Sequence, residues 1–146
     1  MTRSLVTGAA GFIGSHLTET LRSRGDDVVA VDSFTDYYDP ALKEENARDL
    51  PVVRADLVED QLDLDGLDGV FHLAGQPGVA SFGGVFPVYV RENVLASQRL
   101  FEAAAAAGVR TVFASSSSIY GDAAAYPCRE DATPPGPEAE AADSGG

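Results

Sequence analysis

The sequence predicts an α/β fold in which helices cover a parallel sheet, and two observations carry this prediction. Short valine-rich apolar runs alternate with amphipathic helical patterns along most of the chain. Turns rich in glycine and aspartate separate these segments. Strands joined through helices need crossover connections, which are right-handed and produce a parallel sheet. The length of 146 residues suits one domain.

Five strands are expected from the apolar runs. Their residue ranges are 3–7, 27–31, 52–55, 70–73 and 111–114. A doubly wound arrangement places them in the order 3-2-1-4-5, counted along the chain. The fifth strand then forms an edge of the sheet, and we expect its apolar face near Val112 to be exposed.

Three helices are expected between the strands. The first covers 12–24 and ends before Gly25, a residue suited to the left-handed turn that closes a helix. Its apolar residues at helical spacing are Ile13, Leu17 and Leu21. The second is short and covers 41–48. The third is long and runs from near Pro87 to Gly108. Apolar residues line one of its faces: Val90, Val94, Phe101 and Ala105.

The turn between the first strand and the first helix is the most informative segment. Gly8 permits a tight turn, Gly11 lets the backbone approach a pyrophosphate, and Gly14 lets the helix pack against the strand. The helix N-terminus then favours an anion. Asp32 ends the second strand, 18 residues after Gly14, where a carboxylate can bind ribose hydroxyls. The pattern predicts a Rossmann-like domain that binds a dinucleotide; the alternative is a purely structural glycine turn.

The same aspartate indicates which dinucleotide to expect. A carboxylate at Asp32 repels a 2′-phosphate, and neither Ser33 nor Phe34 supplies a compensating cation. NAD is therefore predicted in preference to NADP. No metal site is predicted.

The composition limits the partners and the compartment. A formal net charge of -13 argues against nucleic acid or an anionic membrane surface as partner. Cys128 is the only cysteine, so no internal disulfide can form and a reducing compartment fits. No apolar run approaches the roughly 20 residues that span a bilayer, and no signal peptide precedes the first strand. A cytoplasmic location is expected.

The character of the chain changes from about residue 122. The sequence becomes rich in proline, acidic residues and alanine, with little that could be buried in a core. We expect a folded domain over 1–121 and a disordered or non-native tail over 122–146.

The segment Thr7–Leu17 resembles the opening of the extended short-chain dehydrogenase/reductases, the NAD-dependent sugar-nucleotide epimerases and dehydratases. Further motifs extend the resemblance to about Asp131. The resemblance implies that residues of the glycine turn, of the strand ends and of the third helix contact NAD. These residues are Gly8, Ala10, Gly11, Phe12, Ile13, Gly14, Asp32, Asp56, Leu57, Leu73, Ala74, Gly75, Gln76, Asn93 and Ser115.

Three of the matching positions also have simpler interpretations. The resemblance implies that Asp56 accepts a hydrogen bond from the exocyclic amine of adenine, but this residue could instead be a helix N-cap or a surface acid. Asn93 matches a family motif and could equally serve only to bind backbone within the fold. His72 ends a buried strand, and we expect it to be packed or hydrogen-bonded rather than catalytic.

The serine run after the fifth strand carries the expected chemistry. Ala114–Gly121 resembles the family motif that contains a catalytic serine or threonine, and alignment on Tyr120 and Gly121 places that hydroxyl on Ser116, with Ser117 next to it. The alternative is a plain polar loop. Tyr37–Asp39 followed by Leu42 and Lys43 resembles UDP-glucuronate 4-epimerases, although Ala80 stands where the family often has arginine.

One departure from the family is larger. The family's catalytic base is the tyrosine of a Tyr-x-x-x-Lys pair, in which the lysine lowers the tyrosine pKa. The residues four positions after the five tyrosines are Ala41, Leu42, Asn93, Ala124 and Glu130, and none is lysine. We therefore expect a truncated chain without epimerase turnover. Only the first of the two helices through which the family dimerises is expected, so a homodimer is doubtful.

The resulting expectation is the NAD-binding portion of a nucleotide-sugar epimerase or dehydratase, with a UDP-sugar as the substrate of the intact enzyme. Three alternatives remain open at this point. The chain could be a non-catalytic NAD-sensing module, one half of a split enzyme, or an unfolded relic.

Overall fold

A computed structural model describes residues 1–78, 83–120 and 127–129 of the chain. The chain divides into two compact units, residues 1–114 and 115–146. All five strands belong to the first unit. The described part of the second contains a single turn of 3₁₀ helix, η2 (Ser117–Tyr120), and the exposed, free Cys128. The tail expected over 122–146 lies outside the described residues except for 127–129.

The sheet has five parallel strands in the order β3-β2-β1-β4-β5. They are β1 (Arg3–Thr7), β2 (Asp27–Asp32), β3 (Val52–Arg54), β4 (Gly69–His72) and β5 (Arg110–Phe113). The expected order is confirmed, and each strand lies within one residue of its expected bounds. Because the winding direction reverses between β1 and β4, a crevice is expected at the carboxyl ends of these two strands.

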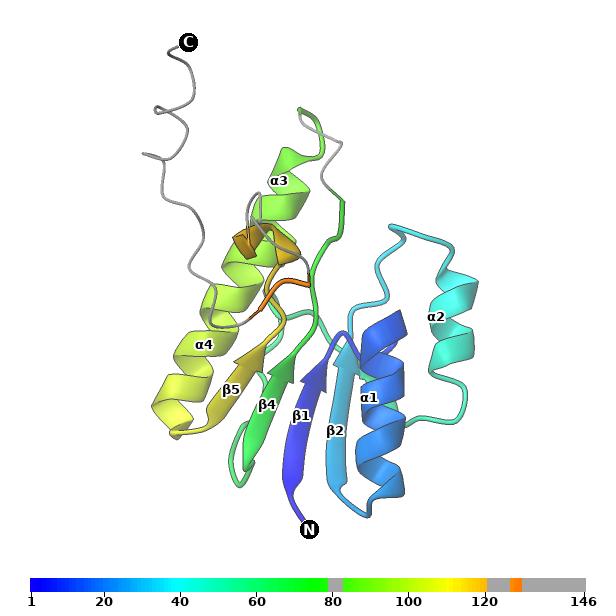
Figure 1. Cartoon of the computed structure of the whole chain (residues 1–146), viewed down its shortest axis with the longest axis vertical. Coiled ribbons are helices and arrows are strands. Elements are labelled where there is room, and N and C mark those ends of the chain that lie inside the picture. The colour runs from blue at the N-terminus through cyan, green and yellow to red at the C-terminus, as the bar shows by residue number, and fades with distance from the viewer. Residues whose placement is uncertain (79–82, 121–126, 130–146) are drawn as a thin grey trace. The chain divides into compact units, whose positions relative to one another are not determined.

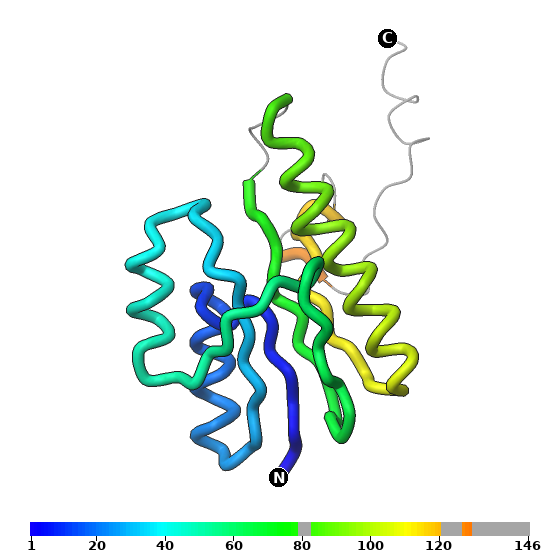
Figure 2. Tube along the Cα trace, turned by 180° about the vertical axis from the view of Figure 1, so that it is seen from behind, coloured from blue at the N-terminus to red at the C-terminus, as the bar shows by residue number. Residues whose placement is uncertain are grey.

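Alternation along the strands creates a separate core on each face of the sheet. Leu5 of β1 packs in one cluster with Leu100 and Ala104. The next residue, Val6, packs in the other cluster with Leu21. Neighbouring side chains of a strand point to opposite faces, so both faces must be covered. Figure 1 shows helix α1 over one face, and the reverse view in Figure 2 shows helix α4 over the other.

The two N-terminal helices begin and end where the sequence indicates. Helix α1 (Phe12–Ser23) closes through Gly25, whose φ of 84° is left-handed, as expected. Helix α2 (Pro40–Asn46) starts behind Asp39, whose side chain accepts a hydrogen bond of 3.0 Å from the Ala41 amide. No helix in the described part of the chain is long and apolar enough to cross a membrane.

The long third helix differs from the expectation of one continuous α-helix. It consists of α3 (Phe86–Tyr89), a π-helical segment η1 (Val90–Leu95) and α4 (Ala96–Ala107), and it ends at the left-handed Gly108. A π-helical turn bonds i to i+5 and widens the helix locally. The apolar spacing alone could not predict this, because the same residues fit an α-helical pattern.

The apolar face expected for this helix is not the one that is buried, because Val90, Val94, Phe101 and Ala105 are all exposed. Residues Ala96, Ser97, Leu100 and Ala104 are buried, whereas Val94 is 63% exposed. Along the edge strand β5, Val112 and Phe113 are about half exposed, as expected for Val112.

Candidate cofactor-binding site

The turn from β1 into α1 is built around glycines, as the sequence predicts. Gly8 has a φ of 71°, and a Cβ there would lie 2.7 Å from the Ala74 amide nitrogen. A Cβ on Gly14 would overlap the Gly8 carbonyl. Among the described residues, no side chain caps the N-terminus of α1, and its first turn contains no acid. The amides at this end of the helix therefore present a partial positive charge suited to an anion.

Asp32 ends β2 and is held by main-chain amides. It is 7% exposed, and its Oδ2 and Oδ1 accept hydrogen bonds from Ala10 (3.1 Å) and from Phe34 (2.7 Å). Phe34 has a φ of 54°, a left-handed conformation that is uncommon for a bulky residue. The carboxylate is thus fixed beside the glycine turn, with lone pairs left for further donors.

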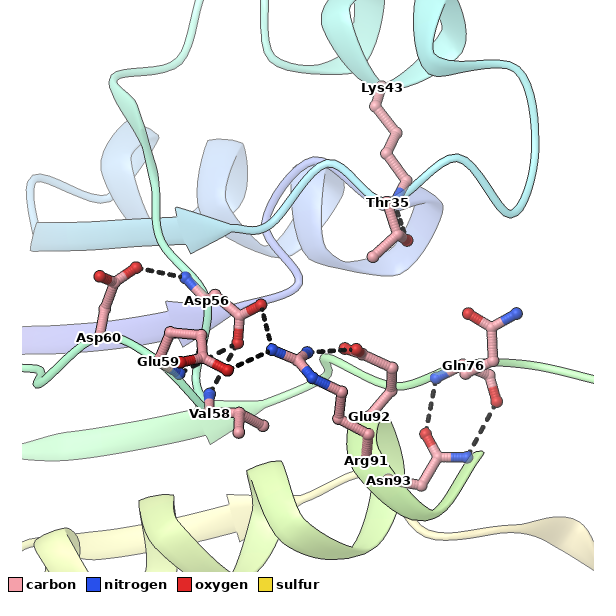
Figure 3. Close-up of polar contacts among 10 residues, drawn as sticks. All are labelled: Thr35, Lys43, Asp56, Val58, Glu59, Asp60, Gln76, Arg91, Glu92 and Asn93. Carbon is pink, nitrogen blue, oxygen red and sulfur yellow. Dashed lines mark hydrogen bonds and ion pairs between the residues drawn. The ribbon is translucent and has the colours of Figure 1, made fainter. Parts of the chain in front are cut away.

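Lys43 brings a cation to this carboxylate, and sequence reasoning missed it. Its Nζ lies 3.8 Å from Asp32 Oδ1, donates to Thr35 Oγ1 at 3.0 Å (Figure 3), and lies 5.1 Å from the centre of the Tyr38 ring. Burial and the nearby Asp32 charge raise the pKa of Tyr38. Lys43 is the chain's only lysine, and in the sequence it stands out only as part of the segment that resembles UDP-glucuronate 4-epimerases. It lies too far along the sequence from Asp32 for a local pattern to pair them.

One cavity of about 390 Å³ joins the glycine turn, Asp32 and Lys43. Its walls include eleven of the predicted contacts: Gly8, Gly11, Phe12, Ile13, Gly14, Asp32, Leu57, Leu73, Ala74, Gly75 and Gln76. They also include polar residues that were not predicted, among them Thr35, Tyr37, Tyr38, Lys43 and Glu92. Ala10, Asp56 and Asn93 are not among the wall residues. The cavity opens at the carboxyl ends of the strands, where ligands bind in open parallel sheets.

Asp56 is engaged on both carboxylate oxygens (Figure 3). Oδ1 accepts hydrogen bonds from the amides of Val58 (2.8 Å) and Glu59 (3.3 Å), and Oδ2 from Arg91 Nη2 (2.9 Å). Burial acts to raise the pKa of Asp56, but these hydrogen bonds and the Arg91 charge outweigh it and lower the pKa. Asp56 therefore caps a turn; it is not the N-cap of a helix, since none follows it before β4, and the adenine role stays a prediction.

Asn93 binds the backbone of the loop after β4. Its Oδ1 accepts from the Gln76 amide at 2.6 Å, and its Nδ2 donates to the Gln76 carbonyl at 3.0 Å (Figure 3). This pair of hydrogen bonds fixes Gln76 along the cavity wall. A direct contact of Asn93 with a cofactor stays a prediction.

His72 is fully buried and hydrogen-bonded through both ring nitrogens, as expected. Nδ1 lies 2.7 Å from Thr7 Oγ1, and Nε2 lies 2.9 Å from Ser97 Oγ. The ring stacks on Phe113 and meets Phe101 edge-on. Burial lowers the pKa of His72 to about 4, so the ring is neutral at physiological pH.

The predicted serines lie in the second unit, residues 115–146. Within that unit, Ser116 Oγ accepts from the Ser118 amide and donates to Ser118 Oγ, both at 3.1 Å. Ser117 begins the 3₁₀ turn. The roles of Ser115, Ser116 and Ser117 stay predictions.

Comparison with known proteins agrees with this geometry. The sequence model of the NAD dependent epimerase/dehydratase family matches residues 4–141. An uncharacterized UDP-glucose epimerase, YtcB of Bacillus subtilis, is 43% identical over 129 residues, which cover 81% of this chain and 41% of that protein. UDP-glucuronate 4-epimerase 1 of Arabidopsis thaliana is 42% identical, covering 80% of this chain and 30% of that protein.

Solved structures give the same result for the fold. The UDP-glucuronic acid 4-epimerase of Bacillus cereus, crystallised with UDP-glucuronic acid and NAD, matches with a TM-score of 0.81 and 36% identity. The match covers 91% of this chain and 46% of that one, so the chain spans less than half of the relatives it resembles. With the family model matched over nearly all of its length, the chain belongs to the NAD-dependent epimerase/dehydratase family.

Proposed function

We propose that this chain binds NAD and forms the cofactor-binding part of a nucleotide-sugar epimerase or dehydratase, with a UDP-sugar as substrate of the whole enzyme. The observation that carries the proposal is a single cavity in which the uncapped N-terminus of α1 and the fixed carboxylate of Asp32 meet. The helix N-terminus suits a pyrophosphate and the carboxylate suits a ribose, and a dinucleotide contains both groups.

The residues of the cavity fit NAD part by part. The glycine turn suits a pyrophosphate, because the turn can close only without Cβ atoms at Gly8 and Gly14, which would collide with the backbone of Ala74 and Gly8. Asp32 and Lys43 offer an acceptor and a donor to the ribose hydroxyls next to the adenine. Leu57 on the wall and Asp56 beside it suit the adenine ring and its amine.

The preference for NAD over NADP rests on Asp32. Its carboxylate is nearly buried and cannot turn away, because two amides hold it. Lys43 balances part of this charge, but it already donates to Thr35 and faces Asp32. A 2′-phosphate would therefore meet a fixed negative charge.

When bound, NAD supplies the acceptor for a hydride from C4 of the sugar. We propose that the Ser116 hydroxyl, with Ser117 next to it, binds the reacting sugar hydroxyl in the whole enzyme. The Tyr-x-x-x-Lys pair that serves as base in this family does not occur in the 146 residues. We therefore propose that these residues alone bind cofactor without completing epimerisation.

Thermal unfolding of the 146-residue chain with a series of ligands tests the proposal. NAD and ADP-ribose should both raise the unfolding midpoint, since a ligand at 100 times its Kd stabilises the native state by about 2.7 kcal/mol. Nicotinamide mononucleotide should raise the unfolding midpoint much less, because Asp32 and Lys43 suit the adenosine half of the dinucleotide, which this ligand lacks. NADP serves as the matched control for the 2′-position. An unfolding midpoint that NAD leaves unchanged would contradict the proposal.

A further inference from the structure

Arg91 joins three carboxylates that come from two separate parts of the chain (Figure 3). Its Nη2 lies 2.9 Å from Asp56 Oδ2 and 3.0 Å from Glu59 Oε1, and its Nη1 lies 2.6 Å from Glu92 Oε1. The guanidinium is about one-third exposed. It thereby links η1 to the loop that follows β3.

Three consecutive residues of η1 reach three different parts of the molecule. Arg91, Glu92 and Asn93 are consecutive, yet Arg91 contacts the loop after β3, Glu92 lines the cavity, and Asn93 binds Gln76. Consecutive side chains of a helix point in different directions, and π-helical turns occur often at functional sites.

Among the residues that the structure describes, three donors bind the Asp56 carboxylate, and one of its lone-pair positions has none. A carboxylate offers about four lone-pair positions. Three are taken by the Val58 amide, the Glu59 amide and Arg91. The side chain is 31% exposed, and the neighbouring Leu57 lines the cavity. The remaining acceptor position is thus available next to the cavity wall.

We propose that Arg91 is a positioning residue for adenine recognition: it fixes the Asp56 carboxylate so that its open acceptor position receives the exocyclic amine of the bound dinucleotide. The inference rests on the proposed function, since it concerns the adenine end of the NAD site. Without Arg91, the carboxylates of Asp56, Glu59 and Glu92 share no cation and repel one another. Asp56 then keeps the two amides on Oδ1 but loses the side-chain donor that holds Oδ2.

Nicotinamide hypoxanthine dinucleotide separates this role from a merely structural one, because it differs from NAD in carrying an oxygen where adenine has its amine. Calorimetric Kd values for both ligands give a discrimination ratio for each variant of the full chain. A hydrogen bond to a charged group is worth about 10- to 100-fold, so the wild type should prefer NAD by a factor in that range. Arg91→Gln should lower the ratio to below about 3-fold.

Two variants complete the experiment. Arg91→Lys keeps the cation but not the planar fork, so its ratio should lie between those of wild type and Arg91→Gln. Arg99→Gln removes an exposed arginine of α4 and should leave the wild-type ratio unchanged. If circular dichroism shows that Arg91→Gln does not fold, the discrimination ratio of Arg91→Lys decides whether Arg91 has the positioning role.

The outcomes distinguish the two proposals. A wild type that binds neither dinucleotide overturns the proposed function. A wild type that binds both equally, or Arg91 variants that keep the full ratio even while binding both more weakly, overturns the positioning role and leaves NAD binding intact.

Discussion

The two sides of β1 form their parts of the site in different ways. On the β2 side, glycines without Cβ atoms shape the turn, and two main-chain amides hold Asp32. On the β4 side, side chains of η1 hold two loops: Asn93 binds Gln76 after β4, and Arg91 reaches over to Asp56 in the loop that follows β3, a strand of the β2 side. The backbone-built side is defined by sterics, whereas the side-chain-built side depends on charge and on residues far apart in sequence. A substitution on the backbone-built side should therefore disrupt folding and binding together. Substitutions on the side-chain-built side should have smaller and graded effects.

The largest effect should come from Gly14→Ala on the backbone-built side. The added methyl overlaps the Gly8 carbonyl, which is backbone and cannot swing away. We expect a loss of roughly 3 kcal/mol or more in the free energy of unfolding, with loss of NAD binding. Chemical denaturation measures the first and calorimetry the second. Gly84→Ala is the matched control, since no described residue other than its chain neighbours lies within 4 Å of its Cβ position, and it should change stability by less than about 0.5 kcal/mol.

The next effect is pH-dependent and belongs to the β4 side. The folded pKa of His72 is about 4, below its unfolded value of 6.5, so the unfolded state binds more protons between these values. Stability should be full above pH 6.5 and fall as the pH drops toward 4, by about 3 kcal/mol in total from this group. Denaturation of wild type and His72→Gln across this range measures it. Equal pH slopes for the two proteins would show that His72 is not responsible.

Lys43→Met tests whether the cation beside Asp32 takes part in binding. The substitution keeps most of the buried volume and removes the charge 3.8 Å from the carboxylate. We expect NAD affinity to fall about tenfold, as for loss of a hydrogen bond from a charged donor. Arg48→Met, an exposed cation at the end of α2, is the control and should bind NAD as wild type does. Unchanged affinity in Lys43→Met would mean that Lys43 only holds the loop.

The smallest effect should come from the surface of the β2 side. Glu44 pairs with Arg54 at 2.9 Å, but both side chains are about 60% exposed. Glu44→Gln should change the free energy of unfolding by less than about 0.5 kcal/mol, because solvent screens such pairs. Urea denaturation at low and high salt checks this. A change above 1 kcal/mol would show that the pair supports the Arg54 stack on Phe34.

The same contrast explains what the sequence could predict. The order of the strands, the glycine turn and Asp32 follow from local patterns, since each residue type serves a need within its own segment. Arg91 could not be found in this way, because its partners Asp56 and Glu59 lie 35 and 32 residues away. The role of Lys43 could not be predicted from the sequence for the same reason. The π-helical segment could not be predicted because its apolar spacing is also that of an α-helix.

Asp32 also limits how the cofactor preference of this protein could change. The carboxylate expected to reject a 2′-phosphate is the same group that holds the Ala10 and Phe34 amides. A substitution that admits NADP would also leave two main-chain donors without their acceptor. Ligand choice and local folding are therefore coupled at one residue, so engineering or evolution toward NADP requires at least two changes: a new phosphate-binding group, and a new acceptor that keeps the turn closed.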